Sequence, residues 1–285
     1  MPIFNVYIAV DFSGSKNSAW QQRSIAFAEW ERSLSPYVQK GFTRPNVVDY
    51  LLERIIDHNR SGKRVLCGFD FQYSFPNGFW HALTGLPDTW TNILQGISKG
   101  VSDLPPITEQ PESNARQWAE VANHRIASLM EIKRGPFWGA NFSQVKDPKF
   151  PFLHAPFKEF RLVEKLSQGF KPIFKIGGKG AVGLQSLCGM PYLFHIRQIC
   201  LQEHISLHCW PFDGWDPTGS THLLVEWYPA LYNQGSKSDE LDALACVEWA
   251  KNIDDQEMLS NYLISPLTHS NKAQATIEGW VLGIP

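Results

Sequence analysis

The stretch that decides the fold is IFNVYIAV at residues 3–10, followed directly by DFSGS at residues 11–15. The first part is an almost unbroken apolar run with two β-branched valines, and the second is a Gly/Ser turn. Because the run shows no alternation of apolar and polar residues, both faces of the strand that it predicts are expected to be buried. The stretch therefore predicts a central β-strand that ends on Asp11.

Three further elements are expected before residue 71. Residues 24–30 (SIAFAEW) predict a second strand, antiparallel to the first across a polar loop. Residues 45–58 carry apolar side chains at helical spacing and begin with a proline, which suits a first helical turn. Residues 64–70 (RVLCGFD) then predict a strand that ends on Asp70. A helix between two strands implies a parallel crossover, so the sequence predicts an α/β fold with a mixed central sheet flanked by helices.

The regular patterning is interrupted in the middle of the chain. Between residues 72 and 171, prolines, tryptophans and phenylalanines crowd among short helical pieces such as residues 115–130, which predicts an insertion or cap. Patterning resumes with a helix after Gly183, strands near residues 205–210 and 222–227, and a helix over residues 238–252. We therefore expect one domain over residues 1–285, with a core from residues 1–71 and 172–285 and a large insertion from 72–171.

Composition limits the class of protein. Hydrophobic residues make up 43% of the 285 residues and charged residues 19%, as in globular domains rather than disordered chains. The five cysteines form no CxxC pair, which argues against a disulfide framework or a zinc ribbon. The N-terminus lacks the pattern of a secretory signal, and no uncharged apolar stretch of about 18 residues occurs. These features predict a cytoplasmic protein without a membrane partner, and they leave its oligomeric state open.

Two aspartates each close a predicted strand. Asp11 and Asp70 follow apolar runs and precede turns. In a parallel arrangement both carboxylates would emerge at the carboxyl ends of the strands, where α/β folds place their sites. An aspartate after a strand also makes a simple Asx-turn, so each residue alone has a structural alternative.

A second pair of aspartates begins the helix SDELDALACV at residues 238–247. Asp239 and Asp242 are three residues apart and share a helix face, close enough to hold a metal together with a third carboxylate. Ser238 suits an N-cap, and acids in a first turn are favoured by the helix dipole, which alone would account for Asp239. Asp242 is surrounded by apolar residues and is expected to need a cation.

The run DELDALA at residues 239–245, together with an aspartate closing the first strand and an acid closing the strand after the first helix, resembles the RNase H superfamily, especially its Holliday-junction resolvase branch. More of the chain resembles a family of uncharacterised proteins with a predicted RNase-H-like nuclease fold. The matching stretches, in chain order, are IAVD at 8–11, GGKGAVGLQSL at 177–187, WPF at 210–212, VEWYPAL at 225–231, DALA at 242–245 and EGWVLGIP at 278–285. They cover the predicted core and not the insertion, and they imply a three-layer RNase-H-like fold.

The resemblance also implies a mechanism. Two Mg²⁺ or Mn²⁺ ions would bridge a scissile phosphate, one activating water and the other steadying the leaving oxygen. Asp11 would contact both ions, Asp70 would hold one, and Asp239 or Asp242 would hold the other. Glu226, at the end of the predicted strand over residues 222–227, is a further candidate as a ligand or as the group that orients the water. Its alternative role is packing at the end of the strand.

A glycine-rich stretch, KIGGKGAVG at residues 175–183, precedes a predicted helix. Free N–H groups at a helix start attract anions, so Lys175, Gly177, Gly178, Lys179 and Gly180 are candidates for binding phosphate. Ser13, Ser15 and Lys16, in the turn after the first strand, are candidates for the same role. The stretch is not a Walker A sequence, and its alternative is a flexible bend.

Cations and aromatic residues are mixed between residues 133 and 179, where ten Lys and Arg accompany three acids. Surfaces that bind single-stranded nucleic acid have this composition. The alternative is that the aromatic residues form a core under a solvated basic face. The residues concerned are Lys133, Arg134, Phe137, Trp138, Phe142, Lys146, Lys149, Phe150, Phe152, Phe157, Lys158 and Arg161.

Three functional hypotheses follow. The first is a nuclease that depends on Mg²⁺ or Mn²⁺ and acts on DNA or RNA. The second is a nucleotide-binding phosphotransferase or ATPase of the sugar-kinase, Hsp70 and actin group, which shares the predicted core. The third is a non-catalytic binding module that retains the fold. The sequence leaves the choice between DNA, RNA and nucleotide open.

Overall fold

A mixed six-stranded sheet forms the centre of the computed structural model, which describes residues 2–139, 152–166, 169–217, 219, 221–233, 238–264 and 266–285. Its strand order is β3-β2-β1-β4-β8-β7. Strands β1, β4, β8 and β7 are parallel to one another, and β2 runs antiparallel to β1 and β3. The bounds are β1 Val6–Asp11, β2 Ala26–Glu31, β3 Tyr37–Gln39, β4 Val65–Phe69, β7 Leu207–Cys209 and β8 His222–Glu226.

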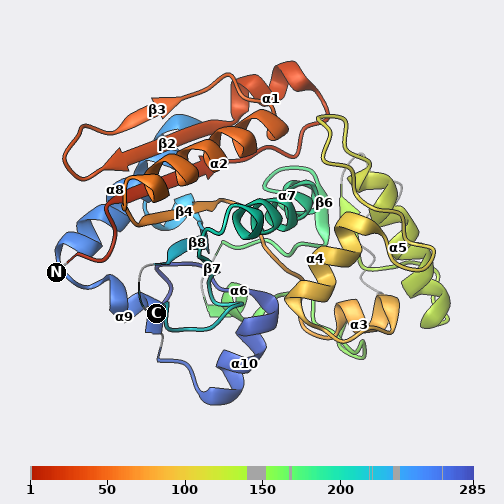
Figure 1. Cartoon of the computed structure of the whole chain (residues 1–285). Coiled ribbons are helices and arrows are strands. Elements are labelled where there is room, and N and C mark those ends of the chain that lie inside the picture. Colours follow the sequence, from red (N-terminus) through yellow and green to blue (C-terminus); the bar gives the residue numbers. More distant parts are fainter. Residues whose placement is uncertain are drawn as a thin grey trace.

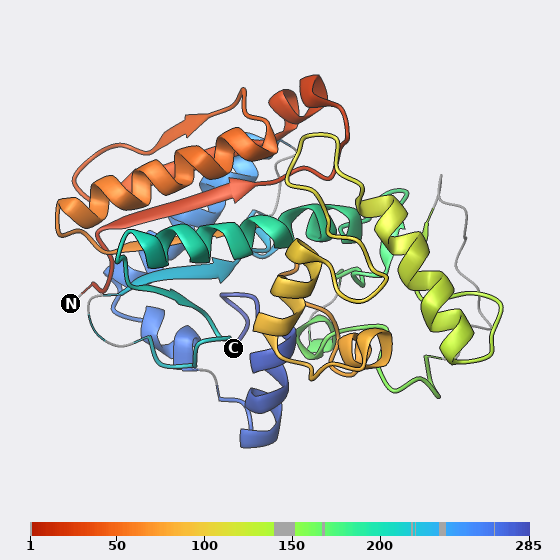
Figure 2. The ribbon, with the colours of Figure 1, turned by 45° about the vertical axis from the view of Figure 1, so that its right-hand side comes forward.

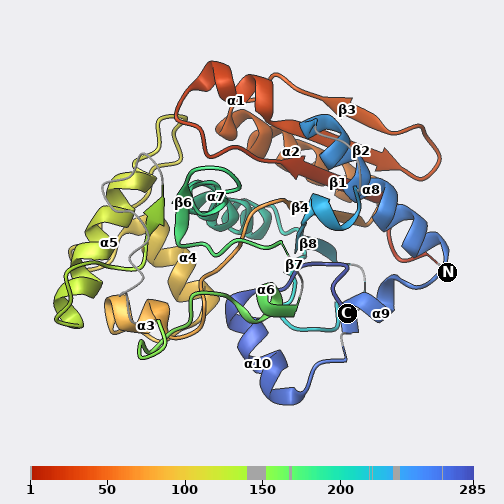
Figure 3. The same cartoon turned by 180° about the vertical axis from the view of Figure 1, so that it is seen from behind.

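Helices cover both faces of this sheet (Figure 1). On one face α2 (Arg44–Arg60) and α7 (Gly183–Gln202) bury apolar side chains against one side of the strands. On the other face α8 (Asp239–Asp255) packs on β1 and β2, as the view from behind in Figure 3 shows. The helices α9 (Leu259–Ile264) and α10 (His269–Glu278) complete that side. The protein is therefore an α/β fold with a mixed sheet between two helical layers.

The central strands are buried throughout. Val6 to Val10 of β1 and all five residues of β4 are buried. This confirms the prediction of a central strand from the apolar run at residues 3–10. The predicted helix at 45–58 and the parallel strand at 64–70 correspond to α2 and β4. The later predictions correspond to α7, β7, β8 and α8.

One expectation near the N-terminus was wrong in detail. Residues 12–25 are not only a polar loop, because α1 (Ser18–Ser24) forms there, with Asn17 accepting a hydrogen bond from the Trp20 N–H at 2.8 Å. Ser24 belongs to this helix, so the second strand begins at Ala26 rather than at residue 24. The expected antiparallel pairing of that strand with β1 is present.

The region between β4 and α7 packs on the rest of the domain. It contains α3 (Phe79–Thr84), α4 (Trp90–Lys99), α5 (Ala115–Leu129), β5 (Trp138–Gly139) and α6 (Leu162–Leu166), and β5 pairs with β6 (Lys175–Gly177). Residues 115–129 form a helix of 15 residues rather than a short piece. Aromatic side chains of this region, such as Trp80, Trp118 and Phe137, belong to the same continuous core as β1, β4 and α7. Figure 1 shows α3, α4 and α5 together beside α7.

Among the described residues, no helix combines the length and the apolar character that crossing a membrane requires. All five cysteines are buried free thiols.

Candidate functional site

Asp11 and Asp70 lie side by side at the carboxyl edge of the sheet. Strands β1 and β4 are parallel and paired with Val10 opposite Phe69, so Asp11 and Asp70 are the next residues in the same register. The Asp70 N–H donates a hydrogen bond to the Val10 carbonyl at 3.2 Å, which extends the pairing by one step. Neighbouring strands are about 4.8 Å apart. The fold therefore places two carboxylates next to each other.

Both aspartates face the side of the sheet that α8 covers. Side chains alternate along a strand, and Tyr7 and Ala9 of β1, like Leu66 of β4, belong to the core on the α8 side. Asp11 and Asp70 follow these residues at even spacing. The first turn of α8 contains Asp239 and Asp242. The charges of Asp70, Asp239 and Asp242 all raise the pKa of Asp11, so the four predicted aspartates, called the acidic site below, lie near one another.

The Asp70 carboxylate is held in a fixed orientation. Its Oδ1 accepts hydrogen bonds from the Phe12 N–H at 2.6 Å and from Nε2 of Gln185 at 2.8 Å. Gln185 lies in the first turn of α7, so this helix and the loop after β1 both position the carboxylate. Since both bonds end on Oδ1, they orient the group without engaging Oδ2.

Charge repulsion and burial raise the proton affinity of the site. Burial raises the pKa of Asp70 to about 7, against the hydrogen bonds from Phe12 and Gln185, and the charge of Asp242 adds to the increase. Burial also raises the pKa of Asp11 well above its ordinary value, and the charges of Asp70, Asp239 and Asp242 raise it further. A group of carboxylates in this condition is stabilised by a proton or by a cation.

The two aspartates of α8 have different surroundings. Asp239 is 41% exposed at its side chain and pairs with Nζ of Lys40 at 3.3 Å, while the same lysine reaches Glu240 at 3.1 Å. Asp242 is half-buried and accepts a hydrogen bond from Nδ2 of Asn233 at 2.7 Å. Burial, opposed by Asn233, raises the pKa of Asp242, and the charge of Asp239 raises it further.

The environment expected for Asp242 needs a correction. Asp242 lies within the first turn of α8, like Asp239, so the helix dipole favours both carboxylates. It is also less buried than its apolar neighbours in sequence imply, because the outer side of the helix start is open to solvent. Ser238 caps the helix as expected, accepting a hydrogen bond from the Leu241 N–H at 3.3 Å.

The four carboxylates have the donor chemistry that a hard divalent cation prefers. Carboxylate oxygens are the ligands that Mg²⁺ and Mn²⁺ prefer, and three of the four carboxyl groups, those of Asp11, Asp70 and Asp242, have pKa values raised by their neighbours as well as by burial. In the part of the chain that the structure describes, no three or more His, Cys, Asp or Glu side chains are grouped so that they could hold a metal ion. Asp11 and Asp70 are the residues that would hold a cation, with Asp239 and Asp242 facing it from α8.

Glu226 lines one pocket with Asp70, but its carboxylate has different partners from those of the four aspartates. It is paired with Phe69 in register, one step before the row of Asp11 and Asp70, so its side chain faces the opposite side of the sheet. Its carboxylate receives two hydrogen bonds from Arg161, at 2.8 and 2.5 Å, and a third from the Tyr73 N–H at 3.1 Å. These contacts are those of the packing role that was the alternative for Glu226, and its predicted role as a ligand or in orienting water stays a prediction.

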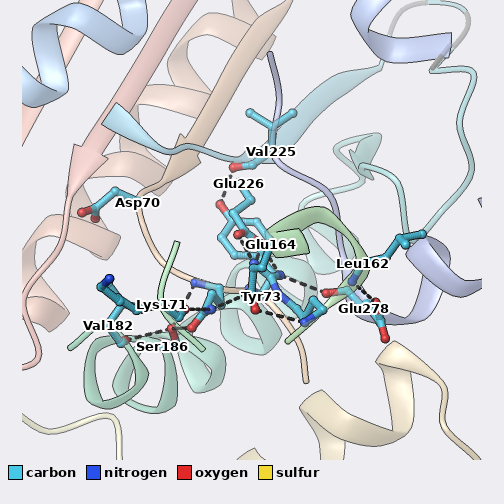
Figure 4. Close-up of polar contacts among 12 residues, drawn as sticks. Asp70, Tyr73, Leu162, Glu164, Lys171, Val182, Ser186, Val225, Glu226 and Glu278 are labelled. Atoms are coloured by element: carbon cyan, nitrogen blue, oxygen red, sulfur yellow. Dashed lines mark hydrogen bonds and ion pairs between the residues drawn. The ribbon is translucent and has the colours of Figure 1, made fainter. Parts of the chain in front are cut away.

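Arg161 is the centre of a buried ionic cluster around Glu226. It also pairs with Glu164 at 2.6 Å, and it donates to the Glu278 carbonyl at 2.9 Å. The Glu278 carboxylate accepts hydrogen bonds from the N–H groups of Leu162 and Asn77. In Figure 4 the Asp70 carboxylate points away from Glu164, Glu226 and Glu278. The cluster joins the region before α7 to β8 and to the C-terminal segment.

The glycine-rich stretch is only partly a loop. Lys175 and Gly177 belong to β6, and Nζ of Lys175 donates to the Lys179 carbonyl at 2.6 Å. Lys175 therefore stabilises the turn itself. Gly178, Lys179 and Gly180 are exposed before the start of α7, where the predicted phosphate contact stays a prediction.

The turn after β1 lies against the start of α7. A Cβ on Gly14 would lie 2.8 Å from the Gln185 backbone nitrogen, so only glycine fits this approach. Arg44, which is 1% exposed, donates to the carbonyls of Ser13 and Ser15 at 2.9 and 2.6 Å. Ser13 is buried, while Ser15 is half-buried and Lys16 is exposed.

In the described part of the basic aromatic segment the aromatic side chains pack in or against the core, whereas Lys133, Arg134 and Lys158 are exposed. Phe137 and Phe157 are at most 1% exposed, and Arg161 is fully buried in its ionic cluster. The expectation that these three residues form a nucleic-acid surface was wrong, because the same side chains pack the domain interior. Phe142, Lys146, Lys149 and Phe150 lie outside the described residues.

The residues that position the acids were not identified from the sequence. Lys40, Asn233 and Arg161 come from distant segments and carry no local motif. Gln185 lies in the GGKGAVGLQSL stretch at 177–187, but the stretch does not reveal which residue contacts Asp70. Comparison of the chain with protein-family models, with curated proteins and with solved structures found no match.

Proposed function

We propose that the protein is a metal-dependent phosphodiesterase, a nuclease with an RNase-H-like core. The observation that carries this proposal is the placement of Asp11 and Asp70 in adjacent register, facing the two aspartates of α8. Carboxylates gathered at the carboxyl edge of a mixed sheet suit the binding of divalent ions, which catalyse phosphodiester hydrolysis. Asp11 on the first strand, Asp70 on the next parallel strand and the D-x-x-D helix also agree with the order that the resemblance implies.

In this proposal, each residue of the acidic site has a role in binding the metal ion or in orienting its ligands. Bound Mg²⁺ or Mn²⁺ would supply an activated water and stabilise negative charge on the phosphate. Asp11 and Asp70 would hold the cation, and Gln185 with the Phe12 N–H fixes the orientation of the Asp70 carboxylate. Asn233 orients Asp242, and Lys40 limits the negative charge on the outer side of Asp239. Glu226 takes no part in catalysis.

The proposal is tested by incubating purified protein with labelled single-stranded and duplex DNA and RNA in Mn²⁺, Mg²⁺ or EDTA. We expect cleavage with metal, and a loss of at least about 100-fold in rate for Asp11→Asn and Asp70→Asn, since each removes a ligand charge. Asp57→Asn is the matched control, because Asp57 is 59% exposed near the far end of α2. Full activity in Asp11→Asn would contradict the proposal.

The nucleotide-handling alternative has one observation in its favour. The packing of Gly14 on Gln185 brings the Ser13–Ser15 turn next to the start of α7, which follows the exposed glycines 178 and 180. Two such loops could hold the phosphates of a nucleotide. Thermal stabilisation by Mg-ATP, without stabilisation by Mn²⁺ and oligonucleotides, would favour this function over the nuclease. Absence of any Mn²⁺ binding would favour a non-catalytic module.

A further inference from the structure

The helix α1 presents a tryptophan to solvent beside the acidic site. It begins seven residues after Asp11, at the end of the sheet toward which β1 points (Figure 2). Trp20 is 57% exposed, although an indole of this size is usually buried in a globular domain. Together with Ser15, Asn17, Ala19 and Arg23 it lines a shallow hollow on the surface.

Buried polar side chains hold this helix rigidly in place. Gln21, which is fully buried, donates hydrogen bonds to the carbonyls of Ser15 and Pro111 at 2.7 and 2.9 Å. Its Oε1 accepts one from the Arg44 N–H at 3.0 Å, and Arg44 in turn binds the turn before α1. The backbone that carries Trp20 is therefore held in place, so binding a ligand there costs little conformational entropy of the protein.

Two cations accompany the exposed indole. Lys16 and Arg23 are exposed, and neither forms an ion pair with an acid among the residues that the structure describes. Arg23 lies three residues after Trp20, so the two side chains are neighbours on the helix surface. The combination of an open aromatic face and unpaired cations is complementary to a nucleobase and its phosphates.

We propose that Trp20, Arg23 and Lys16 form a binding platform for single-stranded nucleic acid, with one unpaired base stacked on the Trp20 indole. The inference rests on the proposed function, because it assigns a substrate class to the acidic site at the same edge of the sheet. The four aspartates repel a polyanion, so a substrate needs cationic contacts outside the acidic site. A single strand fits better than a duplex, since the base faces of a duplex are already stacked on each other.

Binding to the full chain in EDTA tests the platform separately from cleavage. Fluorescence anisotropy is measured with a labelled 12-nucleotide single strand, as DNA and as RNA, and with a hairpin duplex of the same length. We expect Trp20→Ala to weaken single-strand binding by about five-fold or more and Trp20→Phe to retain most of it, because stacking on one base contributes about 1–3 kcal/mol. Arg23→Ala is expected to weaken binding and reduce its dependence on salt.

Arg60→Ala is the matched control for charge, because Arg60 is exposed at the end of α2 that is farther from Arg44 and the turn before α1. Unchanged affinity in Trp20→Ala, or equal affinity for the duplex and the single strand, would overturn the platform. Cleavage and binding fail separately: binding in EDTA that depends on Trp20, without cleavage in Mn²⁺, would support the platform and contradict the nuclease. Metal-dependent cleavage together with unchanged cleavage and binding in Trp20→Ala would support the nuclease and contradict the platform.

Discussion

At the scale of single residues, the site depends on the position of each acid within its strand. Asp11 and Asp70 are paired across two parallel strands and face α8, whereas Glu226 is one step earlier in register and faces the other way. A shift of one residue reverses the face of a strand side chain. Three acids at three strand ends therefore divide into the proposed cation ligands, Asp11 and Asp70, and a buried ion pair at Glu226.

The protonation of Asp70 makes the response to metal depend on pH. Its pKa is raised to about 7, so between about pH 4 and 7 the folded state holds a proton that the unfolded state has lost. The stability of the metal-free protein should therefore fall as the pH rises through this window. Mn²⁺ competes with that proton, and it should raise the melting temperature more at pH 8 than at pH 5.5.

Asp70→Asn is the variant that isolates this effect. Its amide oxygen can still accept the hydrogen bonds from Phe12 and Gln185, so in EDTA at pH 8 we expect it to be more stable than the parent by about 1–3 kcal/mol. The difference should shrink at pH 5.5, and Mn²⁺ should not stabilise the variant. Differential scanning fluorimetry measures all four conditions, and an equal Mn²⁺ shift for the parent at both pH values would contradict the assignment.

Measurements of stability and of Mn²⁺ affinity distinguish the role of Glu226 from that of Asp70. Glu226→Gln leaves Arg161 with fewer charged partners in a fully buried cluster, which should cost about 2–4 kcal/mol. We expect Mn²⁺ affinity, measured by calorimetry on the folded variant, to be unchanged. A variant of normal stability with weakened Mn²⁺ binding would instead make Glu226 a metal ligand.

At the scale of helices and strands, the sequence predicts most of the core because local patterns determine it. The apolar run at residues 3–10 and the periodic helix at 45–58 match β1 and α2, since burial of both faces or of one stripe is visible in the residue order. The short helix α1 was missed although Asn17 caps it, because Gln21 of this helix is held by Arg44 and Pro111, which are distant in sequence. The partners of the acids, Lys40 and Asn233, depend on tertiary packing in the same way.

The turn after β1 contacts the start of α7, and a change in this contact should alter the position of Asp70 in the acidic site. Gly14→Ala would place a methyl group 2.8 Å from the Gln185 backbone nitrogen, so the turn or the helix must shift. We expect a loss of about 1–3 kcal/mol in stability, as for overpacked sites, together with weaker Mn²⁺ binding because Gln185 holds Asp70. Thermal melts with and without Mn²⁺ measure both effects. Loss of stability with unchanged Mn²⁺ affinity would show that Gln185 does not position Asp70.

At the scale of the whole molecule, the described part of the predicted insertion shares its core with the rest of the domain. The buried aromatic side chains of α3 to α5 continue the core beneath α7, and the Arg161 cluster connects the same region to β8 and the C-terminal segment. In the described residues between 72 and 171, most elements are short and pack by large aromatic side chains, which accounts for the interrupted periodicity. Sequence patterns of regular helices and strands do not describe such packing.

The edge of the sheet opposite the acids contains a buried histidine that makes stability depend on pH. His222, which is 2% exposed, lies between Asn59 and the Val65 N–H, at 3.0 and 3.2 Å. Burial lowers its pKa to about 4. The unfolded state therefore binds a proton near pH 6.5 that the folded state does not, and stability should fall as the pH falls from 6.5 to 4.

His222→Gln should remove this dependence. Between pH 7 and pH 4 we expect the parent to lose about 2–3 kcal/mol more than the variant, which corresponds to its lowered pKa. Urea unfolding at both pH values measures the difference. Parallel stability curves for the two proteins would contradict the assignment of a neutral, buried His222.

The most direct test of the acidic site is the anomalous scattering of a crystal soaked in Mn²⁺ near pH 8. We predict a manganese peak in contact with the carboxylates of Asp11 and Asp70, on the side of the sheet that α8 covers, and none in the same position for Asp70→Asn. A crystal with no manganese between these carboxylates, or with manganese bound at Glu226 instead, would contradict the account.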